Sequence, residues 1–342
     1  MTRSPILRTL LQPLGLVYGL AAGLRATLYR SGLLRNRRLP GIVISVGNLT
    51  VGGTGKTPMV LYVAERLAAE GHRPAILTRG YRGFRQGGPA ANADADEVAL
   101  LRQRLNGRAQ FGIGKDRYKN GLALAKNGAQ WFILDDGLQH LALHRDADIV
   151  LLDSTNPFGG GLLPAGRSRE PRSALARADV IVITRTNSAP ALETLVRRFT
   201  SAPVFYAQTQ LFDVVPLSPP AAALSEPDRR QLQPFAFCGI GNPSAFFDDL
   251  ARWGFTLVGR RSFADHHCYS PEEIRDLNAA ASAAGANCLI CTEKDCFNLP
   301  DLPHPAALPI YVCAIRMALN DEDGLWRAVR ASVARKQPVA QA

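Results

Sequence analysis

Short apolar runs alternate with longer segments of helical composition from residue 41 onward. Runs rich in Val, Ile and Leu are predicted to be strands, with helices between most of them. The predicted strands are 42–46, 74–78, 131–134, 148–152 and 180–183. Strands that alternate with helices in this way favour a parallel sheet of the α/β class.

The pattern changes around 205–233, where the sequence is rich in proline and predicted to be irregular. A second, smaller α/β region then begins at Phe235, with a helix near 243–252 and another at 271–284. Strands are predicted near 255–259 and at 287–291. We therefore expect an N-terminal helical segment over 1–40, a first domain over 41–215, a connector over 216–233 and a second domain over 234–330.

The most informative polar segment follows the first predicted strand and precedes a helical run. It consists of Thr50, Val51, Gly52, Gly53, Thr54, Gly55, Lys56 and Thr57. A glycine-rich turn between strand and helix that ends in Gly-Lys-Thr is typical of a phosphate-binding P-loop. Its backbone amides converge on phosphate oxygens, Lys56 adds a positive charge, and the Thr57 hydroxyl is suited to hold Mg²⁺. The strict pattern has glycine at position 50, where this chain has threonine.

A second segment, Trp131 to Gly137, is an apolar strand that ends in Asp135 and Asp136. This is the Walker B arrangement, which places a carboxylate near the Mg²⁺ of a P-loop. A buried parallel strand with an acidic end is the simpler alternative. Together with the upstream loop, the segment indicates a nucleotide-binding protein.

Composition indicates how many hydrophobic cores the chain can form and in which cellular compartment it folds. A chain of 342 residues with 46% hydrophobic content can fill more than one core. Cys288 and Cys291 form a C-x-x-C, but no second pair with zinc spacing accompanies them. We therefore interpret the six cysteines as reduced, small hydrophobic residues of a cytosolic protein.

Residues 1–40 carry seven arginines and no acidic residue, out of a net charge of +11. The uncharged stretch from Thr9 to Leu24 is short and broken by glycines, which argues against a bilayer span. A helix that lies in a membrane interface fits better, and an amphipathic helix docked on the protein's own core is the alternative. Nucleic-acid binding is not expected, because no aromatic residues interleave with the arginines.

Other polar groups follow predicted strands. They include Thr78 to Gly83, Asp265-His266-His267, and Thr292-Glu293-Lys294-Asp295. The last of these has its lysine in the third place rather than the second, so it does not indicate guanine recognition.

These segments occur in the order of one known family. They are Gly47 to Pro58, Thr78 to Tyr81, Asp96-Glu97, Asp135 to His140, Leu163 to Gly166, Arg169-Glu170-Pro171, Asp265-His266-His267 and Thr292 to Asp295. The chain thereby resembles tetraacyldisaccharide 4'-kinase, the lipid A pathway enzyme of Gram-negative bacteria, from about residue 5 to about residue 325. Two departures stand out: Ala95 precedes Asp96 where the family commonly has glycine, and Arg167-Ser168 replaces a common Pro-Leu.

The resemblance implies a P-loop NTPase-like parallel sheet domain, a second smaller α/β domain and a membrane-docking N-terminal helix. It implies transfer of the γ-phosphate of ATP to the 4'-hydroxyl of tetraacyldisaccharide 1-phosphate, with the active site between the two domains. By the same resemblance, Lys56 bridges the phosphates, Arg169 stabilises charge, and Asp96 with His266 acts as base. Thr57, one or both of Asp135 and Asp136, and Glu170 would organise Mg²⁺. We expect a monomer on the cytoplasmic face of the inner membrane.

A rival function is a membrane-associated P-loop switch or partitioning ATPase, which changes partners instead of modifying a lipid. It accounts for the P-loop, the acidic strand end and the basic N-terminus. It gives no role to Asp265-His266 or to the second domain.

Overall fold

The computed structural model describes residues 5–80, 96–217, 224–300 and 308–336. The chain divides into two compact units. The first unit comprises 1–80, 105–208 and 317–342, and the second comprises 81–104 and 209–316. β7 and β11 run from one unit into the other, so the units share two strands.

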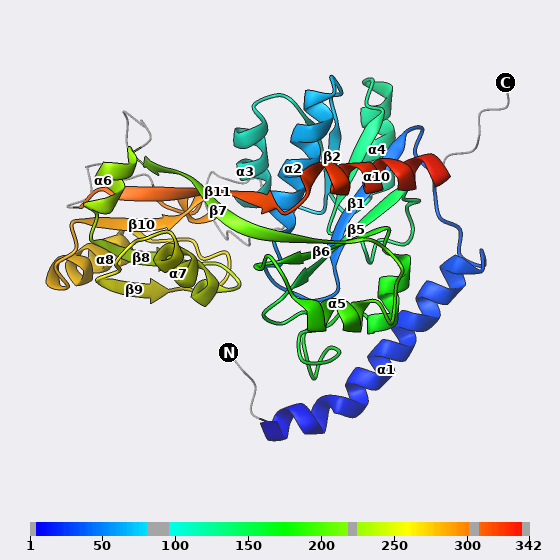
Figure 1. The fold of residues 1–342 in the computed structure, drawn as a ribbon, viewed down its shortest axis with the longest axis horizontal. Helices are drawn as coiled ribbons and strands as arrows, with labels where there is room; N and C mark the ends of the chain where they lie inside the picture. The colour runs from blue at the N-terminus through cyan, green and yellow to red at the C-terminus, as the bar shows by residue number, and fades with distance from the viewer. Residues whose placement is uncertain (1–4, 81–95, 218–223, 301–307, 337–342) are drawn as a thin grey trace. The chain divides into compact units, whose positions relative to one another are not determined.

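A parallel sheet forms the centre of the first unit (Figure 1). Its strands are β1 (Ile42–Asn48), β2 (Ala75–Thr78), β3 (Gln110–Ile113), β4 (Trp131–Asp135), β5 (Ala147–Asp153), β6 (Val180–Thr184) and the start of β7 (Val204–Pro216). They lie in the order β3-β2-β4-β1-β5-β6-β7, and neighbouring strands run parallel. The predicted α/β class is confirmed.

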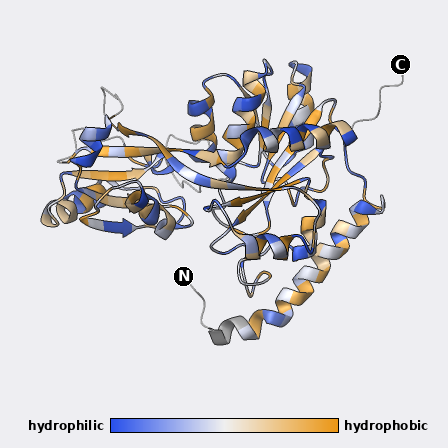
Figure 2. Cartoon of the chain, in the orientation of Figure 1, coloured by the Kyte–Doolittle hydropathy of each residue, from blue (hydrophilic) through white to orange (hydrophobic). Residues whose placement is uncertain are grey.

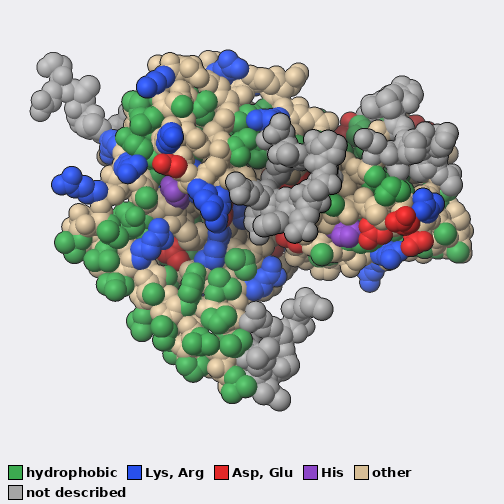
Figure 3. All heavy atoms as spheres, turned by 180° about the vertical axis from the view of Figure 1, so that it is seen from behind, with side chains coloured by type: hydrophobic (Ala, Val, Ile, Leu, Met, Phe, Trp, Pro, Cys, Tyr) green, Lys and Arg blue, Asp and Glu red, His purple; other side chains and the backbone are tan. Residues whose placement is uncertain are grey.

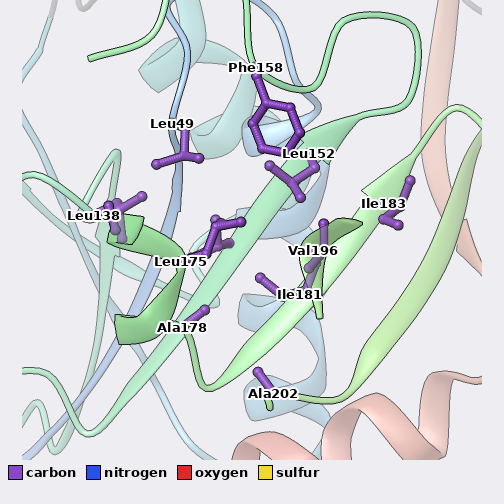
Figure 4. Packing of buried hydrophobic residues seen from close by; sticks show 12 residues of the cluster. Leu49, Leu138, Leu152, Phe158, Leu175, Ala178, Ile181, Ile183, Val196 and Ala202 are labelled. Atoms are coloured by element: carbon purple, nitrogen blue, oxygen red, sulfur yellow. The ribbon is translucent and has the colours of Figure 1, made fainter. Parts of the chain in front are cut away.

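The helices of this unit are α1 (Pro5–Arg30), α2 (Lys56–Ala69), α4 (Arg117–Lys126), α5 (Pro190–Val196), α10 (Glu322–Lys336) and the 3₁₀ helix η1 (Arg172–Arg177). Strands β5 and β6 are buried along their whole length, as expected for parallel strands covered on both faces. On one side, Leu152 and Ile183 pack with Phe158 and Leu175 from the segment that follows β5 (Figure 4). This cluster supports the segment that carries Arg169.

The strands of the second unit lie in the order β7-β11-β10-β8-β9. Its further strands are β8 (Pro234–Cys238), β9 (Gly259–Ser262), β10 (Cys288–Thr292) and β11 (Ile310–Leu319). Its helices are α3 (Asp96–Leu105), α6 (Glu226–Arg230), α7 (Pro243–Arg252), α8 (Pro271–Ala283) and α9 (Glu293–Cys296). α8 begins as predicted, with Ser270 and Glu273 forming a capping box.

The sequence-based prediction was wrong for 205–216, which is not irregular but forms most of β7. Its β-branched and aromatic residues favour a strand, and the prolines that suggested a loop begin only at Pro216, where the strand ends. β3 was also missed, because it is only four residues long. The predicted strand at 255–259 lies later, at 259–262.

The compact units assign two segments differently from the predicted domain ranges. α3, expected in the first domain, clusters with the second unit, and α10, which reaches past residue 317, clusters with the first. The domain boundaries given above stay a prediction.

Helix α1 contains many hydrophobic residues along its length (Figure 2), and several of its large apolar side chains are exposed. Gly15 and Gly19 face inward, where a Cβ on Gly19 would lie 2.5 Å from Leu162 Cδ1. The outward side chains are largely exposed: Leu10 at 70%, Leu16 at 65%, Val17 at 64%, Leu20 at 74% and Leu24 at 62%. Figure 3 shows a band of hydrophobic side chains, with Lys and Arg nearby, where α1 lies. The alternative of a helix that docks its apolar face on the protein's own core therefore does not fit.

None of the described helices is long and apolar enough to cross a bilayer.

Close packing at Gly47 yields a stability prediction. A Cβ at this position would lie 2.6 Å from the backbone nitrogen of Leu138, and neither backbone can retreat without disturbing β1. We expect Gly47→Ala to lower the free energy of unfolding by about 1 to 3 kcal/mol, the range of overpacked sites. Urea unfolding followed by circular dichroism measures this. Gly53→Ala is the control, because a Cβ there meets nothing within 4 Å, and equal losses in both variants would contradict the packing argument.

Candidate active site

The P-loop lies between the carboxyl end of β1 and the start of α2. Gly55, the residue before α2, has φ 88°, and Gly52 has φ 118°. Both values lie in the region that only glycine adopts readily, so these two glycines set the loop's path. The free amides at the start of α2 then point into the loop, which is the ordinary geometry of an anion site.

Two features of the loop fit a bound phosphate chain. Thr54 Oγ1 is buried and has no hydrogen-bond partner among the described residues. The space beside Gly53 is open, because a Cβ at this position would meet no described atom within 4 Å. Arg167 lies against the other side of the loop, where its Nε donates to Val51 O at 3.1 Å. The loop is thus held in shape by its neighbours and open toward a ligand.

A charged cluster surrounds Lys56. Its Nζ donates to Asn48 Oδ1 at 3.2 Å and lies 3.6 Å from Asp136 Oδ1. Arg169 donates to both oxygens of Asp136, at 2.6 and 2.7 Å, and to Asn48 Oδ1 at 2.6 Å. Such a two-pronged pairing fixes the guanidinium plane as well as its charge. Lys56, Arg169 and Asp136, predicted from separate motifs, therefore meet in one place.

Asp136 has an unusual backbone and a shifted pKa. Its φ of 50° lies in the left-handed region, which re-aims the side chain directly after β4. Burial acts to raise the pKa of Asp136, but the hydrogen bonds from Arg169 and the charge of Lys56 outweigh it and lower the pKa to about 2. Asp136 is therefore a carboxylate at neutral pH and is already paired.

The predicted metal ligands fall into two kinds. Asp136 is held by Arg169, and Glu170 accepts from Arg177 at 2.8 and 2.9 Å through its two oxygens. Asp135, at the end of β4, instead accepts a neutral hydroxyl bond from Thr78 at 3.0 Å. Within the described ranges, no three His, Cys, Asp or Glu side chains form a metal-binding group. Hydroxyl and carboxylate oxygens suit Mg²⁺, and the ligand set of Thr57, Asp135, Asp136 and Glu170 stays a prediction.

The second unit contains its own polar pair. His266 Nδ1 lies 3.0 and 2.9 Å from the two carboxylate oxygens of Asp96, although 170 positions separate the residues. Asp96 opens α3, and His266 lies in the loop after β9 with φ 58°. The Asp96 side chain is 4% exposed and that of His266 is 31% exposed, so the imidazole is the accessible member of the pair.

The two groups shift each other's pKa. The hydrogen bond to Asp96 raises the pKa of His266 above its ordinary value. Burial acts to raise the pKa of Asp96, but the bond from His266 and the charge of Lys294 lower it. Both shifts widen the pH range in which a proton on His266 and a negative charge on Asp96 occur together.

Some site residues escaped the sequence analysis. Asn48 joins Lys56 to Arg169, and Arg177 neutralises Glu170. Asn48 is the last residue of β1, and a polar residue at the carboxyl end of a parallel strand next to a P-loop was the available signal. No sequence signal pointed to Arg177, because it reaches Glu170 only through the turn of η1. Tyr81, Arg82, Gly83 and Ala95 lie outside the described residues.

A parallel α/β sheet with a Gly-Lys-Thr loop after β1 and an acidic end on β4 defines a P-loop nucleotide-binding protein. The family model for tetraacyldisaccharide-1-P 4'-kinase matches residues 7–334. The chain belongs to this family.

Similar proteins agree. A tetraacyldisaccharide 4'-kinase of Geobacter sulfurreducens is 42% identical over 331 residues, which cover 92% of this chain and 90% of that protein. One of Pelobacter propionicus is 40% identical and covers 95% of this chain and 92% of its own length. Among solved structures, LpxK of Aquifex aeolicus in complex with ATP has a TM-score of 0.72 and 30% identity, covering 96% of this chain and 99% of that one. The expected family is confirmed, and the match includes both units.

The Asp96–His266 pair makes stability depend on pH. A histidine whose pKa is raised by folding stabilises the fold at low pH, and this contribution is lost as the pH rises through the folded-state pKa. A carboxyl group whose pKa is lowered by folding stabilises the fold at higher pH, and this contribution is lost as the pH falls through the folded-state pKa. The stability difference between the protein and His266→Gln should therefore be largest between pH 3.8 and 6.5, the ordinary values of the two groups. It should shrink as pH rises above this window. Urea titrations at several pH values test this, and a difference that grows toward alkaline pH would count against the pairing.

Proposed function

We propose that this protein transfers the γ-phosphate of ATP to the 4'-hydroxyl of tetraacyldisaccharide 1-phosphate. Family membership over residues 7–334 supports this activity. The observation that carries it is the cluster of Lys56, Arg169, Asp136 and Asn48 beside the P-loop. Phosphoryl transfer depends on positioning and on charge neutralisation, and this cluster supplies both.

In this proposal the backbone of residues 50–57 binds the phosphate chain of ATP. Lys56 and Arg169 stabilise the charge that develops on the transferring group, since both cations are held in place before the substrate arrives. Mg²⁺, when bound, supplies further neutralisation of phosphate charge, and Thr57 and Asp135 would hold it. Asp136 orients Lys56 and Arg169, and Arg177 orients Glu170.

The acceptor hydroxyl must lose a proton. We assign this step to Asp96 and His266 acting as one unit, in which Asp96 orients the imidazole and shares the proton. The accessibility of His266 supports this assignment, because a buried carboxylate behind an exposed imidazole is how many enzymes present a base.

We also propose that α1 docks on the cytoplasmic face of the inner membrane. An apolar arc exposed along a helix, next to arginines, favours a membrane interface over water. Free cysteines in the second unit are consistent with a reducing compartment. We take the protein to act as a monomer in this proposal.

The rival function, a switch or partitioning ATPase, is not favoured. The family model covers the second unit, to which a switch gives no role.

The decisive experiment tests the acceptor requirement. With ATP and Mg²⁺, phosphate should be transferred only when an acylated glucosamine disaccharide 1-phosphate is present in detergent micelles, and mass spectrometry should place it at the 4' position. Lys56→Ala should lower kcat by about 10²-fold or more without changing the urea midpoint. Lys119→Ala, an exposed lysine of α4, is the control and should keep full activity. Equal ATP hydrolysis without the acceptor would point to the switch instead.

A second experiment tests the membrane proposal. Leu20→Ser with Leu24→Ser should weaken binding to anionic phospholipid vesicles at least about tenfold, because each exposed leucine contributes about 1.5 kcal/mol or more when buried. Gln12→Ser changes an exposed polar position of the same helix and should leave vesicle binding unchanged. Co-sedimentation measures both, and undiminished binding of the leucine variant would place the attachment surface elsewhere.

A further inference from the structure

The short helix α9 lies at the carboxyl end of β10 and holds α3 at two points. Lys294 forms an ion pair with Glu97, in the first turn of α3. Glu293 accepts from Arg104 at 3.0 Å, near the last turn of α3. The other oxygen of Glu293 accepts from Ile315 N at 3.0 Å, which ties it to β11. α3, whose first residue is Asp96, is thus fastened to the sheet at both of its ends.

The next residue of the same turn, Asp295, supports the loop that carries His266. Its Oδ1 accepts from Gly239 N and from Tyr269 Oη, each at 2.7 Å. Gly239 O in turn accepts from His266 N at 2.9 Å. Asp295 is 1% exposed, and its Oδ2 accepts from Thr292 Oγ1 at 2.6 Å within the capping box of α9. The carboxylate therefore joins β8, α9 and the loop after β9.

This support matters because His266 has a backbone conformation that it would not adopt unaided. Its φ of 58° is left-handed, and for a residue other than glycine this conformation persists only where neighbours impose it. The bond from His266 N to Gly239 O and the bond from Tyr269 N to Asn298 O, at 3.0 Å, flank the strained residue on both sides. Asn298 lies just beyond α9, and its Nδ2 lies 3.5 Å from Asp96 Oδ2.

We infer that the segment from Thr292 to Asn298 positions the Asp96–His266 pair from both sides, with Lys294 and Glu293 holding α3 and Asp295 holding the His266 loop. The inference rests on the proposed function, because it assigns these residues a role through that pair. Lys294 and Asp295 are positioning residues in this scheme. The Thr-Glu-Lys-Asp sequence, which does not indicate guanine recognition, is thereby assigned a positioning role.

Lys294 affects the Asp96–His266 pair through its charge as well as through the position of α3. Asp96 faces His266 and Lys294, His266 faces Asp96 and Asp265, and Lys294 faces Glu97 together with Asp96 and Asp265. The positive charge of Lys294 lowers the pKa of both Asp96 and His266. Loss of that charge should raise the pH at which the pair takes up its proton, whereas a purely structural residue would leave that pH unchanged.

The test compares Lys294→Met with Lys294→Arg in the full-length protein. Lys294→Met should lower kcat about tenfold with little change in the KM for ATP, because the phosphate cradle is untouched. The acid limb of its kcat/KM profile should move up by about half a pH unit or more. Lys294→Arg keeps the charge and should return the limb toward its original position.

A matched control separates this effect from a general loss of stability. Arg229 pairs with Asp213 in the same unit at 24% and 22% side-chain exposure, close to the 28% and 35% of the Lys294–Glu97 pair. Arg229→Met should therefore change the urea midpoint by a similar amount and leave the acid limb unmoved. If Lys294→Met fails to fold, Glu97→Gln removes the same ion pair from the other side and should also lower kcat at unchanged KM for ATP.

An NMR titration of His266, which does not require turnover, separates failure of the positioning inference from failure of the proposed base. The His266 resonance in NMR, assigned by its loss in His266→Gln, should titrate at higher pH in Lys294→Met than in the unaltered protein. An unmoved acid limb, an unmoved His266 titration and a kcat within twofold in a folded variant would overturn the inference. Should Asp96→Asn keep full activity, the proposed base would fail instead, while a shifted His266 titration would still support the positioning role.

Discussion

The candidate site of the first unit depends on β1 and β4 lying side by side and ending at the same edge of the sheet. Their register places Val46 opposite Asp135, the last residue of β4, so β1 runs on past the end of β4 to Asn48. Asn48 closes β1, Asp136 follows β4, and Arg169 is tied to Leu49 O by its own backbone. The bonds from Arg169 to Asp136 and to Asn48 then join three separate segments of chain. Removal of Asp136 would take the ion-pair partner from Arg169, whose charge is partly buried, which is costly.

The second unit also holds together functional residues that are far apart in sequence, but it uses a buried carboxylate instead of an arginine. Its important histidine has an unfavourable backbone conformation and its partner lies on a helix far away in sequence. Strand ends again provide the solution, since β8 ends at Cys238 and β10 leads directly into α9. A single buried carboxylate, Asp295, satisfies donors from several of these segments at once. Networks of this kind stabilise one arrangement strongly when every member has a partner.

Helix α1 reverses the usual orientation of an amphipathic helix. Gly15 and Gly19 face Leu162, while Leu16, Leu20 and Leu24 are exposed, because close approach to a neighbouring loop requires small residues on the inner side. The sequence showed the apolar composition and the flanking arginines but could not show which side of the helix the protein itself would cover. The position of Leu162 determines which face of α1 packs against the protein, and the sequence pattern of the helix alone carries no information about that position.

Residues that are neighbours along the chain were enough to predict the α/β class, the P-loop, the acidic end of β4 and the family, because each of these depends on a local pattern. β7 was missed, since its strand character was masked by prolines at its end. Local patterns could not show that Asn48 would bridge Lys56 and Arg169, or that α3 would cluster with the second unit. Nor could they show that a four-residue turn would hold both Asp96 and His266. Those contacts join residues far apart in sequence, and only chain packing brings such residues within hydrogen-bond distance.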